Sequence, residues 1–417
     1  MSTPSIKVGQ GNWGIKVGNL LGYANTEKKF SPVEFTSTRS LNTATRVNAS
    51  GNIEIVNQNI PRIDYFGGQA SLLVESSSQN LARQSENFGT TWSAVNLIEF
   101  GSGSVLNSTG TLDPYGTNVA DLIVANTTLA QHRIEQVLTY ASGSYVFSVF
   151  LKAEGYGFAR LRIGGQGATF NLFTGVIIGT DAGIVSSIQS FGNGWYRCII
   201  VKTATAANET IRINILPTSS TADFEGNGTS GIYVFGAQYE TGFAATSYIP
   251  TTTGTVTRSA DVVSVTGVSS LLGQTSGTFY TNISYELRGP STGNRWFEIS
   301  SATNNIGLAV HGINAVRSIV NAQSDLLSSP PFTYDGIKIA WGYDGNGVSF
   351  FMNGVKYSLA SGGSQVITSL DKVLIDMGSA SGARIASVRI RAISCYQTRL
   401  PDTTTDGSPS LQSITTP

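Results

Sequence analysis

Residues 231–240, which read Gly231-Ile-Tyr-Val-Phe-Gly-Ala-Gln-Tyr-Glu240, decide the fold class of this chain. Alternation with a period of two places Tyr233, Phe235, Ala237 and Tyr239 on one face, and Ile232, Val234, Gly236, Gln238 and Glu240 on the other. Such alternation, rich in aromatic and β-branched residues, is typical of a β-strand. Both faces carry apolar residues, so we expect a central strand of a β-sandwich. The extended Ser-Tyr-Ile-Pro250 and the polar segment 251–257 then predict that this strand ends a β-domain.

The composition predicts an all-β protein. Only 12% of the 417 residues are charged, 47 are glycine, and 26 basic residues balance 26 acidic ones. This pattern favours many short strands joined by tight turns, in two or three domains. Zero net charge gives no basic surface, so we expect no nucleic-acid partner. No apolar run approaches 18 residues and the first residues lack an apolar core, so we expect no membrane partner and no signal peptide.

Residues 1–71 are predicted to form a small N-terminal β module. A turn at Asn48–Gly51 joins a short strand at residues 45–47 to another at residues 53–56. Charged residues recur here in a chain with few charges: Arg39, Arg46, Arg62, Glu54, Asp64 and Glu75. They are consistent with an anion site or a catalytic cluster, but ion pairs that fix the loops are the favoured interpretation.

Several ordered motifs carry a resemblance to a known family. They are Arg39-Ser40, Ala44-Thr-Arg-Val-Asn48, Ile53-Glu54, Pro61-Arg-Ile-Asp-Tyr65, Leu72-Leu-Val-Glu75, Asn80-Leu81, the strand at 231–240 and Ser247-Tyr-Ile-Pro-Thr251. Over roughly residues 1–260 the chain resembles tailed-phage virion proteins of the head-fibre and tail-fibre kind. The resemblance implies that the N-terminal segment precedes a carbohydrate-binding-module-like β-sandwich, and that the protein binds host glycans.

Residues 72–260 are predicted to form that sandwich, with about eight strands in a jelly roll. One predicted strand, at residues 159–163, exposes Arg160 and Arg162. Aromatic rings offer an apolar face to sugars, which makes Trp92, Trp195 and Tyr196 candidate glycan contacts. For each of them, packing in the core is the favoured alternative.

Residues 261–400 are predicted to form a second β-sandwich. Asn353-Gly354 lies between two alternating segments and predicts a tight hairpin. The segments Tyr343-Asp-Gly-Asn-Gly347, Phe351-Met-Asn-Gly-Val355, Arg384–Ile390 and Leu400-Pro-Asp resemble a concanavalin/laminin-G-type lectin fold, which implies Trp296 and Trp341 as further glycan contacts. Asp335, Asp344 and Asp376 have the chemistry of calcium ligands, although turn positions are favoured for them. Residues 401–417 have the composition of a flexible tail.

Catalysis receives little support from the residue types present. His132 and His311 fall in different predicted domains, and neither domain shows a nucleophile motif. Cys198 and Cys395 each lie in an apolar strand, which predicts two buried thiols. We therefore expect no cofactor, no metal and no enzyme. A catalytic pair of carboxylates, as in a polysaccharide depolymerase, is left as an alternative, and its candidate residues are Glu225, Glu240, Glu286 and Glu298.

Three hypotheses for function follow. The first is a phage fibre or adhesin that binds host surface glycans, the second a virion protein that only builds or decorates the particle, and the third a polysaccharide depolymerase. The first implies a location in the virion, other virion proteins as partners and a homo-oligomer that multiplies weak binding. The resemblance to phage fibres implies a trimer. The residues expected to dock onto the virion are Trp13, Tyr23, Arg39, Arg46, Arg62 and Asp64.

Overall fold

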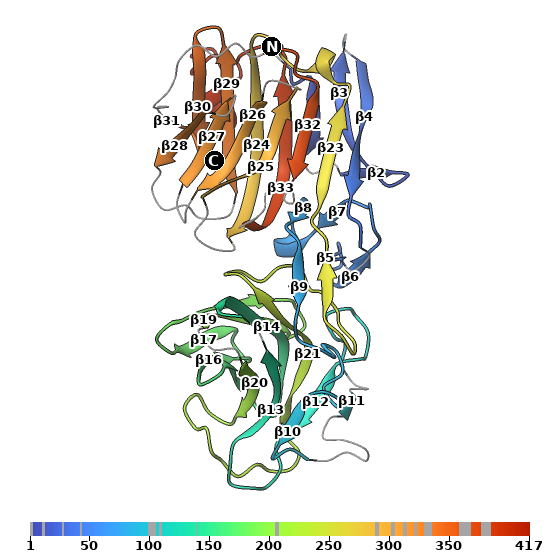
Figure 1. The fold of residues 1–417 in the computed structure, drawn as a ribbon, viewed down its shortest axis with the longest axis vertical. Helices are drawn as coiled ribbons and strands as arrows, with labels where there is room; N and C mark the ends of the chain where they lie inside the picture. Colours follow the sequence, from blue (N-terminus) through green and yellow to red (C-terminus); the bar gives the residue numbers. More distant parts are fainter. Residues whose placement is uncertain are drawn as a thin grey trace. The chain divides into compact units, whose positions relative to one another are not determined.

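The computed structural model describes residues 3–10, 13–26, 29–41, 44–98, 106–107, 111–139, 141–204, 208–287, 292–301, 305–311, 315–320, 323–328, 336–357, 368–376 and 385–417 (Figure 1). Nearly all of its regular structure is β-strand, and the predicted all-β fold is confirmed. The described part also holds two 3-10 turns and one short helix, α1 (Leu411–Thr415). None of its helices has the length and apolar character needed to cross a membrane.

The chain divides into two units that differ from the predicted domains. Unit 1 contains Met1–Asn42, Val56–Ser77 and Ser259–Pro417, and unit 2 contains Thr43–Ile55 and Ser78–Arg258. The chain therefore passes between the units four times, whereas the predicted boundaries after residues 71 and 260 require two passages.

One sheet of unit 1 is built around strand β33 (Ile385–Tyr396), which pairs with β24 (Gly277–Leu287) along one edge. Along its other edge β33 pairs with β1 (Ile6–Gly9) and with β8 (Ser71–Glu75). The sheet continues from β24 through β29 (Ile337–Asp344), β30 (Gly347–Met352) and β31 (Val355–Tyr357), and from β8 to β7 (Arg62–Asp64).

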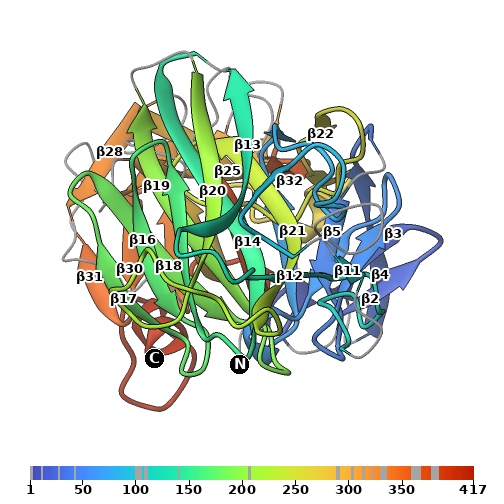
Figure 2. The ribbon, with the colours of Figure 1, turned by 90° about the horizontal axis from the view of Figure 1, so that it is seen from below.

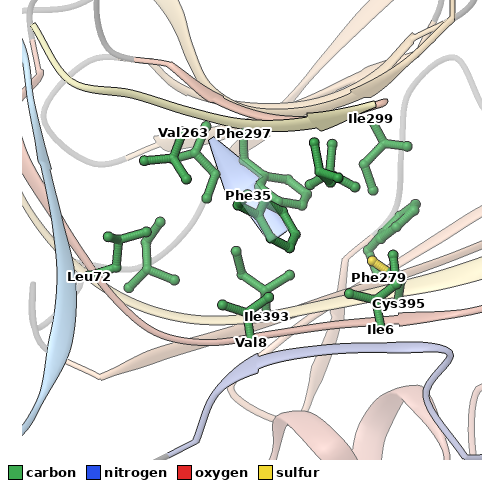
Figure 3. Packing of buried hydrophobic residues seen from close by; sticks show 14 of the residues in the cluster. Ile6, Val8, Phe35, Leu72, Val263, Phe279, Phe297, Ile299, Ile393 and Cys395 are labelled. Carbon is green, nitrogen blue, oxygen red and sulfur yellow. The ribbon is translucent and has the colours of Figure 1, made fainter. Parts of the chain in front are cut away.

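The second row of unit 1 runs in the order β28 (Gln323–Ser328), β27 (Ala315–Val320), β26 (Asn305–His311), β25 (Thr292–Ser300), β32 (Lys372–Asp376), β23 (Val262–Thr266) and β4 (Lys29–Thr38). Strand β3 (Asn19–Thr26) joins the two rows, because it pairs with β4, β1 and β2 (Gly14–Lys16). Side chains of both rows meet in one apolar core (Figure 3).

The N-terminal residues are part of this core. Ile6, Val8 and Phe35 are fully or almost fully buried, and they belong to the same cluster as Phe279 and Ile393 (Figure 3). The predicted separate module of residues 1–71 is thus replaced by strands that complete the C-terminal sandwich. Without β1 and β8, strand β33 would have one unpaired edge and the core would be open to water.

Unit 2 is a sandwich of two six-stranded sheets. The first has the order β10 (Ser93–Val95), β13 (His132–Thr139), β20 (Asn208–Leu216), β15 (Phe158–Ile163), β16 (Gln166–Asn171) and β17 (Val176–Thr180). The second has the order β11 (Leu106–Asn107), β12 (Asp121–Val124), β21 (Gly231–Thr241), β14 (Gly143–Glu154), β19 (Tyr196–Ala204) and β18 (Ile184–Ser190). One core contains residues from both sheets, so the predicted β-sandwich is confirmed. Two short ladders accompany it, β5 (Ala44–Val47) with β6 (Ile53–Val56) and β9 (Ser78–Asn80) with β22 (Val256–Arg258).

Strand β21 lies in the centre of its sheet as predicted, but its faces do not follow strict alternation. Its register against β14 shifts next to Gly236, whose φ is +63°. Val234 before the shift and Tyr239 after it both face the main core, while Phe235 packs in a second cluster on the other side. The bulge therefore reverses the facing pattern that alternation predicts.

The hairpin predicted at Asn353-Gly354 is confirmed, whereas the prediction from composition for residues 401–417 is wrong. Asn353 and Gly354 have positive φ and connect β30 to β31, as predicted. Residues 401–417 are not the flexible tail that was predicted, because Ser410 caps helix α1 and Leu411 is fully buried in an apolar cluster of unit 1. Burial of Leu411 and the N-cap at Ser410 stabilise an ordered conformation although most residues of this segment are polar.

Candidate functional site

The outer face of the β13–β20–β15–β16 part of unit 2 carries a cluster of charged and polar side chains. Along these strands Ile134, Ile213 and Leu161 point into the core, so the residues between them point outward. The register places two rows across the sheet, of which Figure 2 labels strands β13, β20 and β16: Glu135, Arg212, Arg162 and Gly167 in one, and Arg133, Asn214, Arg160 and Thr169 in the other. We call this surface, with Asp181 at its edge, the arginine face.

Glu135 holds two of the four arginines. Its Oε2 accepts hydrogen bonds from Nε of Arg133 at 2.8 Å and from Nε of Arg212 at 2.9 Å. Burial acts to raise the pKa of Glu135, but the hydrogen bonds from both arginines outweigh it and hold this pKa below its usual value. The carboxylate is therefore ionised at neutral pH, and both arginines share its Oε2.

Asp181 holds the third arginine. Nη2 of Arg160 donates to its Oδ2 at 2.6 Å, and Nη1 of Arg160 donates to the Thr169 hydroxyl at 3.0 Å. The backbone N–H of Gly167 donates to the same Asp181 oxygen at 2.8 Å. These contacts fix Arg160 across the β15–β16 pair.

Arg162 has no such carboxylate. Its Nη2 donates to the carbonyl of Gly165 at 3.0 Å, and its buried Nε has no hydrogen-bond partner among the described residues. Burial lowers the pKa of Arg162, and the neighbouring Arg160 and Arg212 lower it further, while the charge of Asp181 partly opposes them. Four guanidinium groups thus share two carboxylates on this face, and Arg162 is left with positive charge that no described ion pair neutralises.

Asn214 lies between Arg133 and Arg160 in the register, and it is only 3% exposed. Its Nδ2 is 3.5 Å from Oε1 of Gln131, while its buried Oδ1 has no hydrogen-bond partner within the described ranges. A buried acceptor without a donor costs free energy, typically about 1–3 kcal/mol, so such groups commonly mark a place where a ligand or water binds. Arg162 offers donors on this face, whereas Asn214 Oδ1 lies beneath the surface, so a ligand can reach this acceptor only when neighbouring side chains move.

The aromatic residues predicted to contact glycans are mostly core residues. Trp92, Trp195 and Trp341 are 5%, 2% and 0% exposed, so their rings cannot stack on a sugar. The indole N–H groups of Trp92 and Trp195 donate to the carbonyls of Arg83 and Leu112, which satisfies them inside the protein. Tyr196 is half-buried against the core, and the side chain of Trp296 lies outside the described residues.

The residues predicted to dock onto the virion are placed as follows. Arg39 and Arg62 are buried in unit 1, where Asp261 pairs with both and Glu75 pairs with Arg62 at 2.7 Å. For these two, the favoured interpretation of ion pairs is confirmed. Three further residues have a hydrogen-bond or ion-pair partner: Trp13 donates to the Ala70 carbonyl, Arg46 pairs with Glu54, and Asp64 pairs with Arg389. Tyr23 is 41% exposed. The docking role itself stays a prediction.

The remaining candidates are scattered. His132 is fully buried between the carbonyls of Asn96 and Phe224, and Cys198 and Cys395 are free, buried thiols as predicted. Glu240 is buried and accepts hydrogen bonds from Ser78, Gln238 and Thr246. Asp344 pairs with Arg399, Asp376 lies in β32, Glu298 is half-buried and Glu225 is exposed. Asp335 and the side chains of Glu286 and His311 lie outside the described residues.

Sequence reasoning singled out Arg160 and Arg162 but missed Arg133, Arg212, Glu135 and Asn214. One signal for them was present: charged residues at every second position of apolar strands, in a chain with only 12% charged residues. Their grouping depends on which strands are neighbours, and the pattern within one strand does not contain that information.

No protein-family model and no curated protein matches the chain. Among solved structures, it is similar to a Trypanosoma rangeli sialidase in complex with 2,3-difluorosialic acid, at 10% identity and a TM-score of 0.26, over 93% of this chain and 81% of the sialidase. Mouse laminin α1 domains LG4-5 match at 12% identity and a TM-score of 0.20, over 66% of this chain and 93% of theirs. A tail fibre protein from an E. coli phage matches at 8% identity and a TM-score of 0.23, over 80% of this chain and 42% of that protein.

These matches correct one expectation. The sequence led us to expect that the protein is not an enzyme, but the first of these neighbours is a sialidase, so that expectation is withdrawn. All three TM-scores are below 0.5, and we base no activity, ligand or partner on them.

Proposed function

We propose that this protein is a virion protein that attaches to host surface glycans, and that the arginine face of unit 2 is its glycan-binding surface. The observation that carries the proposal is Asn214, whose buried Oδ1 lacks a donor among the described residues and lies near Arg162, which has no direct carboxylate ion pair among them. Sugars are rich in hydroxyl groups that both donate and accept hydrogen bonds, so they match a surface that presents an acceptor next to guanidinium donors.

The virion part of the proposal has a separate basis. It is supported by the ordered motifs between residues 39 and 75 and between residues 231 and 251, which resemble phage fibre proteins. The glycan part is supported by the geometry of unit 2. The two parts can therefore fail independently.

A glycan array probed with the full-length chain tests the glycan part. We expect binding to a restricted set of glycans, and at least a tenfold loss of signal for Asn214→Ala, because the acceptor is removed. Ser40→Ala removes an exposed hydroxyl in unit 1 and serves as the matched control, which should bind like the wild type. An array without any bound glycan, or equal binding by both variants, would contradict the assignment.

A second candidate function is particle assembly through contacts between copies of the chain. Strand β17 is the edge of its sheet, all five of its residues are exposed, and Ile177 and Ile178 are apolar. Natural edge strands are commonly protected by charges, yet residues 172–190 contain only one, Asp181, which pairs with Arg160. We propose that β17 of a second copy pairs here, and this would repeat the arginine face within one oligomer.

A further inference from the structure

We propose that the glycan bound by the arginine face carries an anionic group, a carboxylate or a phosphate, which Arg162 binds while Asn214 accepts a hydrogen bond from a sugar hydroxyl. This inference rests on the proposed glycan-binding function and adds the chemical class of the ligand.

The charge balance of the face supports an anion. The carboxylates of Glu135 and Asp181 are occupied by Arg133, Arg212 and Arg160, at distances of 2.6–2.9 Å. Arg162 therefore has no carboxylate to pair with in the part of the chain that the structure describes, although it lies among three other arginines. An anionic ligand would relieve the mutual repulsion of these groups, whereas a neutral sugar would leave it unchanged.

The shape of the donor group supports a carboxylate or phosphate rather than a simple ion. A guanidinium presents parallel N–H donors that fit two oxygen atoms of one anionic group. Arg162 stands directly opposite Arg212 on β20, and Nε of Arg212 is already used by Glu135. The position of the anion is thus restricted to the side of the face where Arg162 lies.

Asn214 supplies the part of the site that a free anion does not satisfy. An amide oxygen accepts hydrogen bonds and repels anionic oxygens, so its natural partner is a hydroxyl donor. Asn214 is the cross-strand neighbour of Arg160, and Arg160 is next but one to Arg162 on β15. Hydroxyl and anion are then held one residue pair apart along the strands, within the span of a single acidic sugar or of two adjacent residues of an acidic polymer.

The decisive experiment uses full-length protein in titrations with three probes of matched length. They are an oligogalacturonate, the same oligomer after reduction of its carboxyl groups, and a ribitol-phosphate oligomer of the teichoic-acid type. The same titrations are run with Arg162→Gln, with Asn214→Ala, and with Lys16→Gln. The last variant removes one positive charge from an exposed ion pair of unit 1 and controls for net charge.

We expect the wild type to bind at least one anionic probe, with affinity reduced at least tenfold by Arg162→Gln and unchanged by Lys16→Gln. Which of the two anionic probes binds distinguishes carboxylate from phosphate. Equal binding of the carboxyl-reduced oligomer, or equal affinity of Arg162→Gln, would overturn the anionic class. If such neutral binding still depends on Asn214, the proposed function survives that result. Binding of none of the three probes would also overturn the inference, while the glycan array judges the proposed function separately.

Discussion

Asp261 is the residue on which the buried charges of unit 1 depend. Its two carboxylate oxygens pair with Arg39 and Arg62, and Oδ2 also accepts the backbone N–H of Glu75. Burial acts to lower the pKa of Arg62, but the charges of Asp261 and Glu75 outweigh burial and raise it. The cluster joins three segments that are distant in sequence, so it stabilises the arrangement by which the N-terminal residues enter the C-terminal sandwich.

We predict that Asp261→Asn lowers the free energy of unfolding of unit 1 by about 3 kcal/mol or more, because both arginines would keep a buried charge without full compensation. Scanning calorimetry of the full chain measures the change. Glu34→Gln breaks the exposed pair with Lys16 and should cost less than about 1 kcal/mol. Similar losses for both variants would contradict the role assigned to the buried cluster.

Asp121 predicts a pH dependence in unit 2. It is 2% exposed, and burial raises its pKa to about 6 although the Phe88 N–H donates to it. The folded state therefore holds the proton more tightly than the unfolded state, whose pKa is near 4. As the pH rises from about 4 to about 6, ionisation of the buried Asp121 should therefore lower the free energy of unfolding of unit 2 by about 2 kcal/mol.

Denaturation of wild type and Asp121→Asn at several pH values between 4 and 7 checks this prediction. The asparagine keeps an acceptor for Phe88 but cannot ionise, so its stability relative to wild type should increase with pH across this window. A difference between the two proteins that stays constant with pH would show that Asp121 does not titrate there.

At the scale of single elements, β21 shows how one glycine controls a central strand. An added Cβ at Gly236 would lie 2.9 Å from Cδ2 of Phe150, and the backbone φ of +63° disfavours any side chain. We predict that Gly236→Ala costs unit 2 about 2 kcal/mol of unfolding free energy. Gly254→Ala should change it by less than about 0.5 kcal/mol, since no atom lies within 4 Å of its added Cβ. Chemical denaturation measures both, and an unaffected Gly236→Ala would mean that the bulge is not under steric control.

The same element shows what the sequence can predict. Alternation found β21 and its central place, because the strand signal is local. Strict alternation missed the bulge, although Gly236 inside the alternating run is a sequence signal for one, so the residues before and after Gly236 were placed on the wrong faces relative to one another. The pairing of β1 with β33 could not be predicted either, because Ile6 and Cys395 are almost 400 residues apart and the sequence of one strand does not specify which strand it pairs with. The same holds for the candidate site. The sequence predicted that Arg162 points outward, whereas the position of Asn214 between Arg133 and Arg160 depends on the register of neighbouring strands.

The edge strand β17 leads to a prediction about assembly. If β17 pairs with a second copy around a two-fold axis, Ile178→Lys should shift the protein toward the monomer, because a charge would be buried in an apolar contact. Light scattering of the full chain measures the mass, with Val17→Lys as the control at an exposed position of unit 1. A wild-type monomer of 44.0 kDa at micromolar concentration would contradict self-association, and a trimer that persists in Ile178→Lys would place the contact elsewhere.

At the scale of the whole molecule, the course of the chain changes how virion docking can be tested. Removing residues 1–71 deletes β1, β3, β4 and part of the β8 ladder, so the truncated protein would lose part of the unit 1 core and fail for reasons of folding. Tyr23 is 41% exposed and can be changed without opening the core. Substitution at Tyr23, followed by measurement of incorporation into particles, therefore separates docking from folding.

A structure of the full chain with the tightest-binding glycan from the array would show whether the arginine face of unit 2 binds the glycan. We predict ligand density over β20 and β15, with a sugar hydroxyl within hydrogen-bond distance of Asn214 Oδ1 and an anionic group at Arg162. Glycan bound at another surface, with Asn214 Oδ1 and Arg162 unchanged and free of ligand, would show that the arginine face is not the binding surface.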